Sequence, residues 1–86
     1  MDISFPTKSA YDFSATGIAF PVIVDGYQRR CVVTEEALMD HFGATGIDPA
    51  HLQEAFEANR DRIEAVAEAR IRGGATGEVL LRSRDF

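Results

Sequence analysis

The sequence has a single cysteine, three prolines and no long hydrophobic run. One cysteine excludes an internal disulfide. The first eleven residues have neither a basic start nor an apolar stretch, so we expect no secretion signal and a cytoplasmic protein. No apolar run approaches the roughly 20 residues that a membrane-spanning helix needs, so we expect no membrane association of that kind.

The length of 86 residues allows one hydrophobic core, so residues 1–86 are expected to form a single domain. The net charge of −5 is concentrated in residues 35–72, where nine acids oppose four arginines. The residues before and after this segment are balanced in charge. An acidic helical surface is typical of a solubility device, and an acidic docking surface is the alternative interpretation.

The longest regular stretch predicts one helix over Pro49–Arg72. Asp48 suits the N-cap, Pro49 suits the first helical position, and Gly73-Gly74 suits the end. Apolar residues recur along it at helical spacing and predict one buried stripe. The largest of them are Leu52, Phe56, Ile63 and Val66.

A β-hairpin is predicted over Ile18–Val33, because two apolar, β-branched runs flank Asp25-Gly26, a pair that type I′ turns prefer. The turn fixes the register of the two strands. The expected core-facing pairs are Val24 with Tyr27, Val22 with Arg29, Phe20 with Cys31, and Ile18 with Val33. Pro21 falls opposite Arg30 in a non-hydrogen-bonded pair, so its missing N–H points to the other side of its strand. We expect the sheet to be open or irregular there.

The remaining elements complete an α+β fold. Thr34 can cap a short helix over Glu35–Phe42, which would form a helical hairpin with Pro49–Arg72. Alternation over Glu78–Arg84 predicts a last strand, while residues 1–9 fit either a short strand or an extended arm. The expected architecture is a mainly antiparallel sheet of three to four strands packed on the helical hairpin.

Few residues suggest catalysis or metal binding. Cys31 lies on the predicted core face and fits a buried structural cysteine better than a reactive thiol. His41 and His51 flank the link between the helices, a spacing too weak to indicate a metal site. Gly73 to Gly77 follows a helix instead of opening one, so it is no phosphate loop. We expect no catalytic residues, no metal, no cofactor and no enzymatic activity.

Three residues of the long helix are candidates for interaction. Asn59 and Arg60 form a polar pair on the helix, and Asn59 interrupts its apolar stripe. Asn59 is expected either to bond a loop backbone or to mark a ligand or partner site. A helix of roughly 36 Å is longer than the strands, so its end near Ile71 is expected to overhang. Such an end could pair two copies of the chain, which favours a homodimer over a monomer.

The eight arginines occur in close pairs along the sequence. If the last strand joins the hairpin, Arg30, Arg82 and Arg84 share the outer face of the sheet. That face could meet phosphates, but it has few positive charges and no aromatic side chains to stack bases, on a chain of net charge −5. The favoured function is therefore a non-enzymatic protein-interaction module, and a nucleic-acid-binding protein is the alternative.

The chain resembles a small bacterial family called domain of unknown function 1488. The residues that carry the resemblance are Tyr11-Asp12, Gly26, the run Cys31–Leu38, Phe56, Asn59-Arg60, Ile63 and Asp85-Phe86. None of these is a catalytic signature. The resemblance implies a cytoplasmic α+β domain and brings no assigned activity, cofactor or partner.

Overall fold

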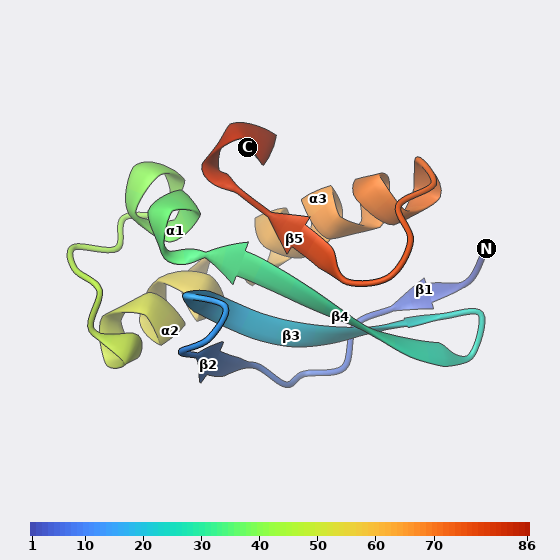
Figure 1. Ribbon diagram of the computed structural model, residues 1–86, viewed down its shortest axis with the longest axis horizontal. Helices are drawn as coiled ribbons and strands as arrows, with labels where there is room; N and C mark the ends of the chain where they lie inside the picture. Colours follow the sequence, from blue (N-terminus) through green and yellow to red (C-terminus); the bar gives the residue numbers. More distant parts are fainter.

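The computed structural model describes residues 1–86 as a five-stranded sheet with helices packed against it (Figure 1). Its elements are β1 (Ile3–Ser4), β2 (Ala10–Asp12), β3 (Gly17–Val24), β4 (Tyr27–Thr34), α1 (Glu35–His41), α2 (Pro49–Ala58), α3 (Arg60–Arg72), β5 (Val79–Leu81) and the 3₁₀ helix η1 (Ser83–Asp85). The predicted α+β class is confirmed. None of the three α-helices combines the length and apolar character needed to cross a bilayer.

The central hairpin has the predicted register. Val24 pairs with Tyr27 and Phe20 with Cys31, and the pairing continues to Gly17 with Thr34. Asp25 and Gly26 both have positive φ, 51° and 86°, as a type I′ turn requires. Alternate residues of β3 and β4 therefore face the helices, as the sequence indicated.

The last strand is shorter than predicted and runs parallel to its neighbour. β5 pairs with Cys31–Val33 of β4, so the sheet is mostly but not entirely antiparallel. The predicted strand Glu78–Arg84 ends at Leu81, because the Asp85 carboxylate accepts a hydrogen bond from the Arg82 N–H at 2.7 Å and closes η1. In Figure 1 this turn leads away from the sheet.

The predicted long helix is interrupted at Asn59. The Asn59 side chain donates to the Ala55 carbonyl at 2.9 Å, which is the acceptor that its own backbone N–H would use in a continuous helix. The backbone N–H of Asn59 bonds instead to the Phe56 carbonyl at 3.1 Å, and its φ of −124° lies outside the helical range. The prediction of one helix over Pro49–Arg72 is therefore wrong, and α2 and α3 follow the sheet as two shorter helices.

The core lies between the sheet and the helices and is entirely apolar. It is a cluster of 17 buried residues, and no polar or charged residue of the chain is buried. Phe20 of β3 and Phe56 of α2 meet near its centre, with ring centroids 5.1 Å apart. Burial of each large side chain contributes roughly 1.5–3 kcal/mol, so this layer supplies most of the stability.

A groove beside Pro21

The side of β3 that faces away from β4 is paired in two separate pieces. β1 pairs with Ile23–Val24 and β2 pairs with Gly17–Ala19. Between these pieces, the five residues 5–9 lie opposite the three residues 20–22 of β3. Two extra residues must therefore leave the ladder at this point, and residues 5–9 form a bulge, named here the arm.

Pro21 explains why the bulge lies here. In a strand, alternate residues direct their backbone groups to opposite neighbours, and Pro21 directs its groups toward the arm. Because proline has no N–H, interrupting the ladder at Pro21 leaves no donor unpaired. The expectation of an irregular sheet beside Pro21 is confirmed.

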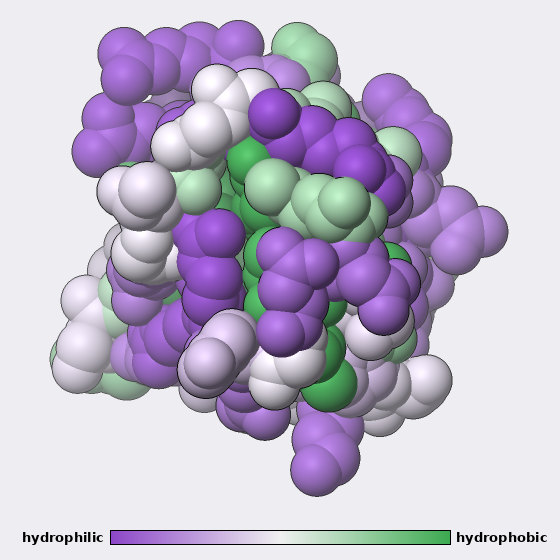
Figure 2. All heavy atoms as spheres, turned by 90° about the vertical axis from the view of Figure 1, so that its right-hand side faces the viewer, coloured by the Kyte–Doolittle hydropathy of each residue, from purple (hydrophilic) through white to green (hydrophobic).

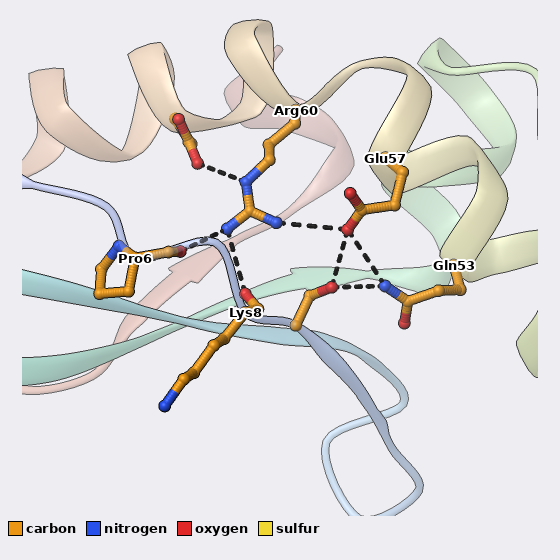
Figure 3. A network of polar contacts seen from close by, with 7 residues as sticks. Pro6, Lys8, Gln53, Glu57 and Arg60 are labelled. Atoms are coloured by element: carbon orange, nitrogen blue, oxygen red, sulfur yellow. Dashed lines mark hydrogen bonds and ion pairs between the residues drawn. The ribbon is translucent and has the colours of Figure 1, made fainter.

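Arg60 holds the arm from the helical layer (Figure 3). Its Nη2 donates to the carbonyl oxygens of Pro6 at 2.8 Å and Lys8 at 3.1 Å. Its other nitrogens pair with Glu64 at 2.6 Å and Glu57 at 3.2 Å, and its side chain is only 13% exposed. The guanidinium thus bonds arm carbonyls that have left the ladder. Arg60 was predicted to bind a partner, but its guanidinium is already bonded to groups of its own chain.

A second polar contact fixes the end of the arm. Gln53 donates to the Ser9 hydroxyl, which donates in turn to a Glu57 carboxylate oxygen at 2.8 Å (Figure 3). The same Glu57 oxygen accepts from Arg60. The two contacts therefore form one network that joins α2 and α3 to the arm.

The bulge leaves a groove of about 790 Å³ between the arm and the central hairpin. Three short stretches line it: Thr7–Ala10, Ala19–Pro21 and Gln28–Arg30. They include Lys8, Arg29 and Arg30 but no acidic residue. The chain as a whole carries a charge of −5, so the lining differs in sign from the rest of the molecule.

Arg30, a predicted interaction residue, is held by two carboxylates on the outer face of the sheet. It pairs with Asp12 across β3 and with Glu78 at 3.0 Å. The hydrogen bond from Arg30, helped by the Ala15 N–H, lowers the pKa of Asp12. Val32, between Arg30 and Thr34 on this face, is completely buried.

Asn59 and Ile71 do not form the surface that the sequence suggested. Asn59 is half-buried, and its side chain bonds the Ala55 carbonyl and, at 3.4 Å, the Phe42 carbonyl of the preceding link.

Ile71 is 1% exposed and belongs to the core. The expectation of an exposed Ile71 on an overhanging helix end is wrong, because the helix is divided and β5 packs beside α3. Figure 2 shows this end of the molecule, where hydrophobic atoms form only a narrow band bordered by hydrophilic residues.

Arg82 and Arg84 do not continue a strand beside Arg30. Arg82 follows the end of β5 and lines a separate hollow of about 500 Å³ with Glu35 and Glu36 at the start of α1. Arg84 lies in η1, and neither arginine forms an ion pair. The predicted row of three arginines on an extended outer face is therefore not formed.

The surroundings of Cys31 and His41 bear on catalysis. Burial raises the pKa of the Cys31 thiol to about 12, so little thiolate exists near neutral pH. His41 Nε2 lies 2.9 Å from the Ser83 carbonyl oxygen and 3.3 Å from the Ser83 hydroxyl, which is itself 2.5 Å from Asp40. Asp40 thus contacts the serine hydroxyl and not the imidazole. When His41 Nε2 carries a proton and donates it to the Ser83 carbonyl, this nitrogen cannot also accept the serine proton as the base of a catalytic triad does.

Sequence reasoning missed the arm and the partners of Arg60. Pro21 pointed to an irregular edge, but nothing local in residues 5–9 indicates how many residues face it. The arm carbonyls that Arg60 bonds lie more than fifty positions earlier in the chain, with sequence separations of 54 and 52. Only the folded arrangement brings them together.

Comparison with known proteins gives one consistent family. The family model described as "Protein of unknown function (DUF1488)" matches residues 3–81. The chain is similar to the uncharacterized protein YrdB of Escherichia coli (strain K12), with 32% identity over 66 residues that cover 77% of this chain and 75% of the relative. A crystal structure of a protein of unknown function from the same family, from Shewanella loihica PV-4, has a TM-score of 0.82 and 25% identity and covers 94% of both chains.

Proposed function

This chain belongs to the DUF1488 family, and we propose that it is a non-enzymatic protein-interaction module whose binding surface is the groove beside Pro21. The observation that carries the proposal is the groove itself, with a volume of about 790 Å³ on the sheet face that the helices leave uncovered. Open grooves that run beside a strand suit extended polypeptide segments, which offer backbone groups and alternate side chains.

The lining supports a polypeptide as the bound molecule. Ala10, Ala19 and Pro21 give an apolar floor, and Thr7 and Gln28 add side-chain donors and acceptors. Interfaces of this kind combine a small apolar centre with a polar rim. The network around Arg60 fixes the arm before binding, which lowers the entropy lost when a partner docks.

The partner in this proposal is a chain of different sequence. The argument for a homodimer depended on an exposed helix end, and Ile71 is buried there. Nucleic acid is the alternative partner, and the arginines it could use are Arg82 and Arg84, whose side chains form no ion pair. The other six are paired with carboxylates, bonded to backbone carbonyls or stacked on an aromatic ring.

A photo-crosslinking amino acid at Gln28 tests the proposal in cells that express the chain. Gln28 is exposed and lines the groove, whereas Glu54 is exposed on α2 and serves as the control position. We expect a discrete protease-sensitive adduct from position 28 and none from position 54. A nuclease-sensitive adduct, or the same adducts from both positions, would reject the groove as a protein-binding surface.

A further inference from the structure

We infer that the segment bound in the groove carries a carboxylate, and that the Lys8 ammonium is the group that receives it. The inference rests on the proposed function and adds the chemistry of the partner. Three basic residues line the groove, but they are not equivalent. What separates them is whether each charge already has a partner within the chain.

The charge of Arg29 is directed out of the groove. Arg29 lies on the core-facing side of β4, opposite Val22 of β3. Its guanidinium donates to the carbonyls of Gly77 at 3.0 Å and Ala75 at 2.8 Å, in the connector before β5. A ligand in the groove would therefore not meet this guanidinium.

The charge of Arg30 is already balanced. Asp12 and Glu78 both pair with it, and these contacts raise the pKa of Arg30. A ligand carboxylate would have to displace one of two carboxylates that are present at all times. Arg30 is therefore a border of the groove and a poor receptor for a further anion.

Lys8 is left as the free cation of the groove. It forms no ion pair, and its side chain extends to the side of the arm opposite Arg60 (Figure 3). Its carbonyl, in contrast, is held by Arg60 at 3.1 Å. Arg60 thus acts as a positioning residue, because it fixes the backbone from which the ammonium projects.

A single free ammonium beside an apolar floor selects for one kind of anion. A nucleic acid presents a row of phosphates, which needs several cations and is repelled at long range by the net charge of −5. One glutamate or aspartate on an otherwise uncharged segment requires one cation, and its neighbouring side chains can cover Ala19 and Pro21. The groove therefore favours a peptide with an isolated carboxylate over a polyanion.

Titration of the isotope-labelled chain with short peptides, followed by amide chemical shifts, tests this inference. The peptides have blocked termini, share a sequence of serine, alanine and leucine, and differ at one central position, which is glutamate, glutamine or lysine. We expect shifts at residues 7–10 and 28–30, with the glutamate peptide binding about three- to fivefold more tightly than the glutamine peptide, the range of one exposed ion pair. The lysine peptide should bind most weakly.

Charge reversal at Lys8 supplies the matched variant. Lys8→Glu should invert the order of the three peptides, whereas Arg84→Glu, with the same change of charge at an exposed position in η1, should leave it unchanged. Equal affinity of the three peptides within the groove would overturn the carboxylate inference and leave the proposed function standing. Shifts confined to Arg82 and Arg84, or tighter binding of a single-stranded oligonucleotide that Lys8→Glu does not weaken, would overturn both.

Discussion

The two sides of strand β3 face different kinds of neighbour. Toward β4 it forms eight consecutive residue pairs with a tight turn at one end. Toward β1 and β2 it forms two and three pairs, with an arm of unequal length between them. The same backbone therefore supports a continuous ladder on one side and a groove on the other.

The difference shows how an interrupted ladder is kept folded. On the β4 side, backbone groups satisfy one another. On the arm side, the Arg60 guanidinium takes over part of this role, since it accepts no hydrogen bonds and offers five donors in a plane. One side chain from the helical layer thus stabilises a segment that the sheet has released.

The largest expected effect on stability comes from removing the Arg60 guanidinium, which replaces ladder hydrogen bonds on the arm side of β3. Arg60→Met keeps the length of the side chain but leaves the Lys8 carbonyl and the Glu64 carboxylate without their donor, and leaves the Pro6 carbonyl with only the Lys8 N–H. We expect a loss of about 2–4 kcal/mol in the free energy of unfolding, measured with urea. Arg72→Met is the matched control, because Arg72 is half-exposed and pairs with Glu68 on the surface. It should change stability by no more than about 0.5 kcal/mol, and equal losses in the two variants would contradict the role given to Arg60.

A somewhat smaller effect is expected at the junction of the helices below the arm. Asn59→Leu removes the donor to the carbonyls of Ala55 and Phe42. The free energy of unfolding should fall by about 1–3 kcal/mol, since the Phe42 carbonyl loses its partner in a partly buried position and the break between α2 and α3 loses the side chain that favours it. An unchanged midpoint in urea would mean that water replaces the amide without cost.

A pH-dependent effect is expected on the outer face, where Arg30 joins the two sides. Asp12→Asn keeps the acceptor for the Ala15 N–H and removes the charge that faces Arg30. Because the folded-state pKa of Asp12 is lowered, its stabilising effect is present above the ordinary aspartate pKa and is lost as pH falls through the folded value. The variant should be less stable than the parent at neutral pH, and the two should converge in acid. A constant difference between their unfolding midpoints down to acid pH would exclude this ion pair as the cause.

The smallest effect is expected at Pro21 itself. Pro21→Val restores an N–H that points toward the arm and the groove, where water can bond it, so stability should change by less than about 1 kcal/mol. Ala19→Pro is the contrasting change on the same side of β3, because Ala19 pairs with Ala10. It should cost about 1–3 kcal/mol through the lost ladder hydrogen bond. Equal costs for the two variants would show that the ladder is not interrupted at Pro21.

The sequence predicted those features that depend on neighbouring residues. Asp25-Gly26 set the turn and register of the hairpin, and Pro21 marked the irregular edge. The division of the long helix was missed, because helical spacing continues through Asn59 while its side chain competes for the Ala55 carbonyl. The arm and its hold by Arg60 were missed because they depend on contacts between distant segments. Ile71 was wrongly predicted to be exposed, because the sequence does not show that β5 packs beside α3.

The parallel pairing of β5 with β4 has a consequence for synthesis of the chain. Val79 and Leu81 are buried core residues, and their strand pairs with Cys31–Val33, which the ribosome makes much earlier. β5 is translated after the hairpin and the three α-helices, so the outer edge of β4 lacks its neighbour until β5 docks. An unpaired strand edge beside an incomplete core is a template for association with other chains. Docking of this late strand therefore completes the core and closes the exposed edge of β4.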